Sequence, residues 1–68
     1  MEKADFIEIL IEMKIAELYA IRSAYTAEHI ERIKKINLLK LTLYHFADNY
    51  SHYKNYIGER LAQFDKEL

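Results

Sequence analysis

Apolar side chains recur at steps of three and four along almost the whole chain, which is the spacing of one face of an α-helix. The first such stretch predicts a helix over about residues 5–24. A break is expected at about residues 23–26, where the hydroxyl of Thr26 can cap the next helix. The first helix carries two neighbouring apolar seams, which are Phe6–Leu10–Met13–Ala20–Ala24 and Ile7–Ile11–Leu18–Ile21–Tyr25.

From about residue 27 to residue 67 the apolar pattern continues without a strong helix breaker. The chain has no proline, and its single glycine is Gly58. The steps follow a heptad rhythm with one irregular step beside Gly58, which marks a candidate point of local unwinding. The apolar seam of this segment consists of Ile36, Leu39, Leu43, Phe46, Tyr50, Tyr53, Ile57, Leu61, Phe64 and Leu68.

This seam leaves two all-α architectures open. An unbroken helix over about residues 27–67 gives a helical hairpin with a long second helix, and the continuity of the seam favours it. Alternatively, the segment breaks near residues 48–51, where Asn49 or Ser51 can cap a third helix, and the chain folds as a compact three-helix bundle. In both cases we expect a single helical domain over residues 1–68.

The hairpin predicts self-association, because the first helix is too short to cover a second helix roughly 60 Å long. Apolar residues between Ile36 and Phe46 point all round the helix, as in a helix that is buried on every side. One small core contributes only ~3–5 kcal/mol, and a chain without cysteine has no disulfide to add. These features predict a homodimer in the form of a four-helix bundle. The predicted self-association residues are Ile36, Leu39, Leu43, Phe46, Tyr50, Tyr53 and Ile57.

Composition narrows the expected compartment and partners. Apolar residues make up 51% of the chain and charged residues 31%, and the net charge is −1. No apolar run approaches the ~20 residues that a membrane-spanning helix needs, and the acidic start MEKADFIEIL lacks the features of a signal peptide. We therefore expect a soluble, cytoplasmic protein without a membrane partner. The absence of cysteine is compatible with a reducing compartment.

The sequence shows no motif of an enzyme. It has no Ser–His–Asp or Cys–His order, no glycine-rich phosphate loop and no zinc-hydrolase motif. The best candidates for a metal site are His45, Asp48 and His52, whose spacing places them on one helix face. Because the two histidines lie about two helical turns apart, this metal hypothesis is weak, and we interpret the three residues as polar positions that face solvent or an interface. No cofactor is expected.

Tyrosine is frequent, with six residues in the chain, and it is enriched at protein interfaces because it combines apolar area with a polar tip. The candidate partner-binding residues are Tyr44, His45, His52 and Tyr56. The sequence thus predicts a small non-enzymatic protein–protein interaction module. Such a module would be a homo-oligomeric helical adaptor, co-chaperone, inhibitor or regulator that acts on a larger protein.

A basic cluster in the second segment gives the alternative function. Arg32, Lys34, Lys35 and Lys40 could contact the phosphates of a nucleic acid. However, the chain is slightly acidic overall, and no short helix-turn-helix pattern is present. A small nucleic-acid-binding regulator is therefore the less favoured prediction.

Overall fold

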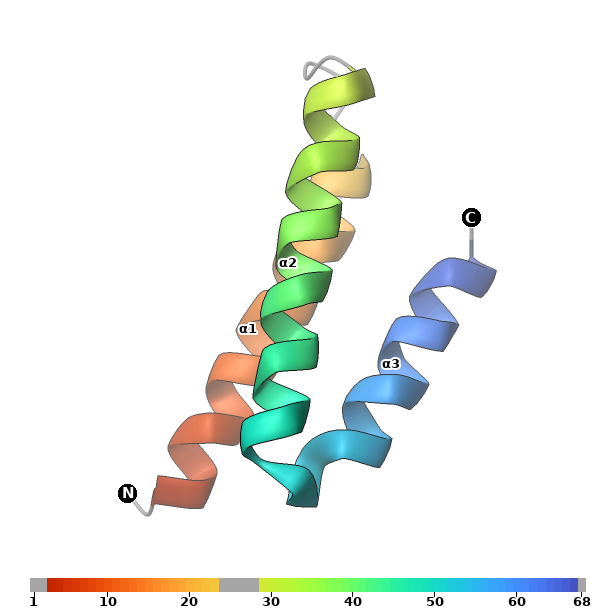
Figure 1. Cartoon of the computed structure of the whole chain (residues 1–68). Coiled ribbons are helices and arrows are strands. Elements are labelled where there is room, and N and C mark those ends of the chain that lie inside the picture. The colour runs from red at the N-terminus through yellow and green to blue at the C-terminus, as the bar shows by residue number, and fades with distance from the viewer. Residues whose placement is uncertain (1–2, 24–28, 68) are drawn as a thin grey trace.

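Three α-helices and one short 3₁₀ turn make up the fold. The computed structural model describes residues 3–23 and 29–67. In it, α1 covers Lys3–Ser23, α2 covers His29–Asn49, and α3 covers Lys54–Lys66, with the 3₁₀ turn η1 at Ser51–Tyr53 between the last two. α1 and α2 run antiparallel, and α3 turns back beside α2 (Figure 1). The all-α prediction is confirmed, and the arrangement fits the three-helix alternative.

The first helix lies close to its predicted position and buries only one of its two seams. Four residues of α1 at steps of four, four and three are buried, and they include Ile15, which neither predicted seam contained. Phe6 and Met13 of the other seam are exposed. The predicted cap Thr26 lies outside the described residues. The buried residues of α1 are Ile7, Ile11, Ile15 and Leu18.

The second predicted helix is broken, so a single helix over residues 27–67 is wrong for this structure. The N–H of Tyr50 still donates to the carbonyl of Phe46 at 2.8 Å, but Tyr50 itself leaves the helix with φ −128° and ψ 75°. The predicted caps are also wrong, because neither η1 nor α3 has a side-chain cap. Asn49 instead donates its side-chain N–H to the carbonyl of His45 at 3.0 Å. Gly58 lies inside α3, where we had expected local unwinding.

The break has a physical reason in the core. Folding α3 back onto α1 and α2 buries three large side chains that a straight helix would leave uncovered in a single chain. Burying one such side chain contributes about 1.5–3 kcal/mol. The core residues outside α1 are Leu43 and Ala47 of α2 and Ile57, Leu61 and Phe64 of α3.

Candidate protein-binding surfaces

Large apolar side chains cover the outside of α2. Leu38 is 66% exposed, Leu41 is 65% exposed and Tyr44 is 51% exposed. The stretch from Ile36 to Phe46 was predicted to be buried on every side. Within one chain this prediction does not hold, because the other helices cover only the inner side of α2. We call the exposed set the outer α2 stripe, and it consists of Ile30, Ile33, Leu38, Leu41 and Tyr44.

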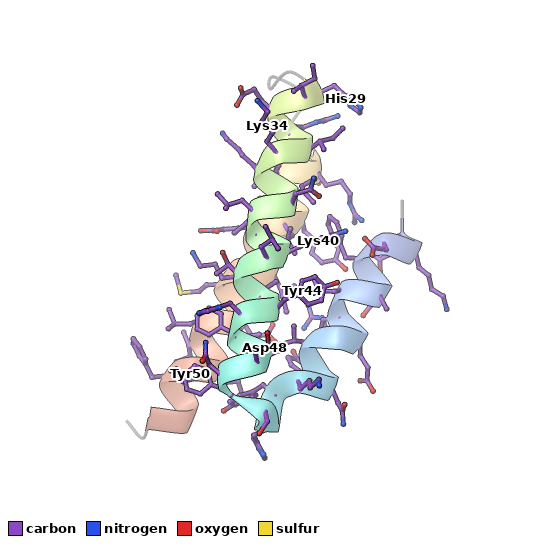
Figure 2. The ribbon with its side chains drawn as sticks, in the orientation of Figure 1. His29, Lys34, Lys40, Tyr44, Asp48 and Tyr50 are labelled. Carbon is purple, nitrogen blue, oxygen red and sulfur yellow. The ribbon has the colours of Figure 1, made fainter. Side chains whose placement is uncertain are left out.

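Opposite charges flank the part of this stripe that contains Leu38, Leu41 and Tyr44. Lys34 lies seven residues before Leu41 and Asp48 seven residues after it, and all three are exposed. Seven residues are about two helical turns, so the three side chains share one side of α2. Figure 2 shows Lys34 toward the start of α2 and Asp48 toward its end. The last three residues of the stripe thus lie between a positive and a negative side chain, and Ile30 and Ile33 precede the positive one.

The outside of α1 carries a second apolar surface, which we call the outer α1 stripe and which consists of Phe6, Ile9 and Met13. All three side chains are exposed, and Ile9 and Met13 line a shallow groove with Glu8, Glu12 and Ala16. Among the described residues of α3, the only exposed large apolar side chain is that of Tyr56. The apolar outer surface of the described chain therefore belongs almost entirely to α1 and α2.

The predicted self-association residues lie mostly inside the chain. Leu43 and Ile57 are both 0% exposed and belong to the core. The other five are partly buried and pack against that core, so within this arrangement they are occupied by contacts inside the chain. The homodimer itself stays a prediction. The five partly buried residues are Ile36, Leu39, Phe46, Tyr50 and Tyr53.

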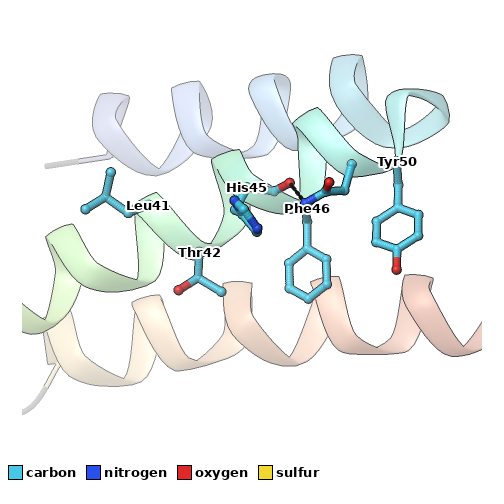
Figure 3. Close-up of a pocket in the computed structure, with 6 residues that line it drawn as sticks. Leu41, Thr42, His45, Phe46 and Tyr50 are labelled. Carbon is cyan, nitrogen blue, oxygen red and sulfur yellow. Dashed lines mark hydrogen bonds between the residues drawn. The ribbon is translucent and has the colours of Figure 1, made fainter.

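A wide groove follows the flank of α2, as Figure 3 shows. The rings of Phe46 and Tyr50 form one part of its lining and are nearly parallel, with centroids 6.1 Å apart. The hydroxyl of Thr42, another lining residue, donates to the carbonyl of Leu38 at 3.0 Å. His45 also lines the groove and is exposed. Apart from His45, the titratable side chain in the lining is that of Tyr50, and apolar contact surface makes up much of the rest.

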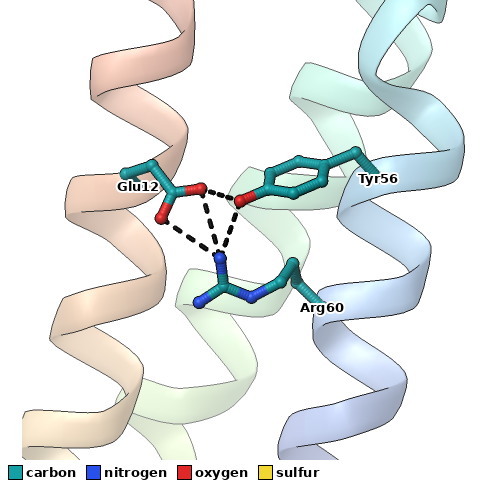
Figure 4. A network of polar contacts seen from close by, with 3 residues as sticks. All are labelled: Glu12, Tyr56 and Arg60. Atoms are coloured by element: carbon teal, nitrogen blue, oxygen red, sulfur yellow. Dashed lines mark hydrogen bonds and ion pairs between the residues drawn. The ribbon is translucent and has the colours of Figure 1, made fainter.

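A polar network of Glu12, Tyr56 and Arg60 joins α1 to α3 (Figure 4). The hydroxyl of Tyr56 donates to the carboxylate of Glu12, and Arg60 Nη1 lies 3.2 Å from each oxygen of that carboxylate and 2.7 Å from the Tyr56 oxygen. The hydrogen bond to Glu12 raises the pKa of Tyr56, and burial adds to this effect. A tyrosine with a raised pKa is a weaker acid and keeps its hydroxyl proton, so Tyr56 remains a donor to Glu12, and the network joins α1 to α3. Sequence reasoning missed Glu12 and Arg60, because their meeting depends on the position of α3.

The candidate metal ligands are not brought together. Within the residues that the structure describes, no group of three or more histidine, cysteine, aspartate or glutamate side chains could hold a metal ion. His45 and Asp48 lie on α2, whereas the break places His52 in η1. There the His52 ring packs edge-on against Tyr53, with centroids 5.2 Å apart. His45 and His52 are both exposed and remain candidates for contact with a partner.

The basic residues do not form one surface. Lys40 Nζ lies 2.6 Å from Asp65 Oδ1 and 5.5 Å from the centre of the Phe64 ring, so it is engaged with α3. Lys34 and Lys35 are exposed, but consecutive helical residues point ~100° apart. Arg32 is half-buried on the side where α3 ends. The arrangement is a poor match for a row of phosphates.

No protein-family model, curated protein or solved structure matches the chain. No helix in the described ranges is long and apolar enough to cross a bilayer. The function is therefore argued from the surfaces themselves.

Proposed function

We propose that this chain is a small non-enzymatic protein–protein interaction module that pairs with a second copy of itself and then acts on a larger protein. The observation that carries the proposal is the outer α2 stripe, where leucine and isoleucine side chains face solvent in the isolated chain. Contiguous apolar surface bordered by polar residues is typical of protein interaction sites. The proposed setting is the cytoplasm, since a chain without cysteine needs no oxidising compartment.

A second copy suits the part of this stripe from Leu38 to Tyr44, because that part is complementary to itself. In an antiparallel pair of α2 helices centred on Leu41, Lys34 of each copy lies opposite Asp48 of the other, since both are seven residues from the centre. Leu38 lies opposite Tyr44 for the same reason. A two-fold axis requires such a match, because the same surface must serve on both copies. This pairing is also a homodimer, but it uses the outer α2 stripe and not the self-association residues that the sequence predicts.

A dimer interface needs only a modest share of the surface of this chain. A stable interface buries about 800 Å² per partner, which is about 15% of the 5163 Å² of accessible surface on this chain. The outer α2 stripe extends over about four turns of helix. The outer α1 stripe stays uncovered in this pairing, and we assign it, together with His45 and His52, to the larger partner.

Introducing two charges into the stripe tests the pairing. Leu38→Glu combined with Leu41→Glu should convert the dimer to a monomer in sedimentation equilibrium, because two buried carboxylates would have no partner. Helix content should be unchanged, because both leucines are largely exposed in the single chain. A control with the same change in net charge is Asn55→Glu combined with Ala62→Glu on exposed positions of α3, and it should remain dimeric. A monomeric parent protein, or equal masses for the two variants, would overturn the proposal.

Charge reversal tests the antiparallel register. Lys34→Glu and Asp48→Lys should each weaken the dimer roughly twofold to thirtyfold, because each dimer contains two such pairs worth about 0.2–1 kcal/mol apiece. The double variant should restore the affinity of the parent protein, since it exchanges the two charges. Additive weakening in the double variant would reject this register and leave the stripe itself in place.

A further inference from the structure

The bend between α2 and α3 contains short-range backbone hydrogen bonds, from Tyr50 to Phe46 and from Tyr53 to Tyr50, but no side-chain cap. Tyr50 turns the chain, and neither Tyr50 nor Tyr53 is supported by a side-chain cap. The segment from Asn49 to Tyr53 contains no proline or glycine, and no described residue has a positive φ. Its Asn, Ser, His and Tyr residues are mediocre helix formers that still allow helical torsions. The position of α3 is therefore fixed mainly by its packing and not by the bend.

The apolar seam continues through the bend without a change of phase. Leu43 and Phe46 precede it, Tyr50 and Tyr53 lie within it, and Ile57 follows at the same steps of three and four. In a straight helix these residues would share one face. The sequence therefore supports both the bent form and a straight form of this segment.

The hydrogen bonds and ion pairs between α3 and the rest of the chain have a geometry that two copies could also form with each other. We call the surface that α3 covers the α3 site, and its members are Glu12, Tyr19, Arg22 and Lys40. Arg22 Nη1 donates to the carbonyl of Phe64 at 3.0 Å, and the Tyr19 ring meets the Phe64 ring edge-on with centroids 5.2 Å apart. Further ion pairs join Lys40 to Asp65, Glu12 to Arg60, and Arg22 to Glu67.

We infer that two copies of this chain can exchange α3, with the bend straightened into helix and the α3 of each copy seated in the α3 site of the other. The exchanged form keeps the contacts of α3, so the balance between the two forms depends on the torsions at the bend and on protein concentration. The two long helices would run antiparallel, because α3 already runs antiparallel to α2 (Figure 1). Leu43 and Ile57 would then meet across copies. This inference goes beyond the proposed function, because it uses the α3 site and not the outer α2 stripe.

Isotope-mixed cross-linking detects the exchange directly. Unlabelled and heavy-nitrogen-labelled protein carrying Leu38→Glu and Leu41→Glu would be unfolded together in guanidinium and refolded at high concentration. A carbodiimide then joins Lys40 to Asp65, whose side chains lie 2.6 Å apart in the bent form. Exchange predicts a dimer whose Lys40–Asp65 cross-links include peptides of mixed isotope. Protein mixed after separate refolding is the control, and it should give cross-links of a single isotope.

A substitution in the bend separates the two forms. Ser51 is the first residue of η1, a position that accepts proline, but in a straight helix proline there would remove a hydrogen bond and clash with the preceding turn. Ser51→Pro should reduce the mixed-isotope dimer at least ~100-fold. Ser51→Ala, its matched control, should leave the yield unchanged or raise it, because alanine favours helix.

The results distinguish this inference from the proposed function. Mixed-isotope cross-links that Ser51→Pro removes and Ser51→Ala keeps would support exchange. The exchange would be overturned by a refolded sample without dimer, or by a dimer with single-isotope cross-links only. Both of these results come from the protein without Ser51→Pro, so they hold even if that variant fails to fold. Since both stripe leucines are replaced in this sample, neither result depends on whether the outer α2 stripe pairs copies in the parent protein.

Discussion

Replacing Phe64 by alanine should release α3 from the rest of the chain. The side chain is 1% exposed, its ring meets Tyr19 edge-on, and the guanidinium carbon of Arg22 lies 4.5 Å from its centre. Truncating a buried phenylalanine to alanine costs about 3–5 kcal/mol. A chain of this length has a total stability of roughly 3–10 kcal/mol. Phe64→Ala should therefore remove at least about a third of the free energy of unfolding.

A second variant keeps the experiment informative if Phe64→Ala does not fold. Phe64→Leu retains most of the buried apolar surface and removes the edge-on contact with Tyr19 and the cation contacts with Arg22 and Lys40. Such ring contacts contribute about 0.5–1.5 kcal/mol each. Phe64→Leu should thus lower the free energy of unfolding by about 1.5–4.5 kcal/mol, the lower part of which leaves the protein helical.

Urea unfolding followed by helical circular dichroism measures both variants. Lys66→Ala is a suitable control, because Lys66 is exposed at the end of the same helix, and its effect should stay within about 0.5 kcal/mol. If Phe64→Ala lowered the free energy of unfolding by less than ~1 kcal/mol, the packing of α3 against α1 and α2 would be refuted.

Three other changes test separate parts of the account. Gly58→Ala should raise the free energy of unfolding by about 0.5–1 kcal/mol in the same urea assay, since no atom lies within 4 Å of the added Cβ; a loss of stability would show that Gly58 is not helical. The raised pKa of Tyr56 means that this residue contributes to the free energy of unfolding below pH 10.0, and that the contribution is lost as pH rises through the pKa of the folded protein. Tyr56→Phe should therefore make the free energy of unfolding fall less steeply at alkaline pH than it does in the parent protein. Urea midpoints at increasing pH measure this difference, and parallel curves would contradict it. Hydrogen bonds from Gln63 and Arg22 lower the pKa of Glu67, so this residue contributes to the free energy of unfolding above pH 4.5, and the contribution is lost as pH falls through the pKa of the folded protein. Glu67→Gln should therefore make the urea midpoint fall less steeply at acid pH. An equally steep acid limb in the Glu67 variant would reject that contribution.

The sequence was most informative where apolar spacing alone decides the structure. It predicted the first helix to within two residues at its start, and it placed Leu43, Ile57 and Phe64 on one seam, which the structure buries. It was ambiguous at the bend because no proline, glycine or cap marks it. The bend exists because α3 gains more by packing on its own chain than a straight helix gains alone, and that comparison depends on the tertiary structure.

Two features of the candidate surfaces could not be predicted from spacing. Leu38 and Leu41 belong to a stretch that is apolar all round, so the pattern could not tell which side the chain itself would cover. The network of Glu12, Tyr56 and Arg60 joins residues more than forty positions apart, and their meeting requires the position of α3. The sequence identified Tyr56 as an interface residue, and the structure places its hydroxyl in a contact within the chain.

The central claim is that copies of this chain pair in solution, and its most direct test is the mass of the unmodified protein by light scattering across a dilution series. The account predicts twice the 8.2 kDa mass of one chain at high concentration, with a concentration-dependent fall toward 8.2 kDa. A mass of 8.2 kDa at every concentration would contradict the account and leave the outer α2 stripe without the occupant proposed for it.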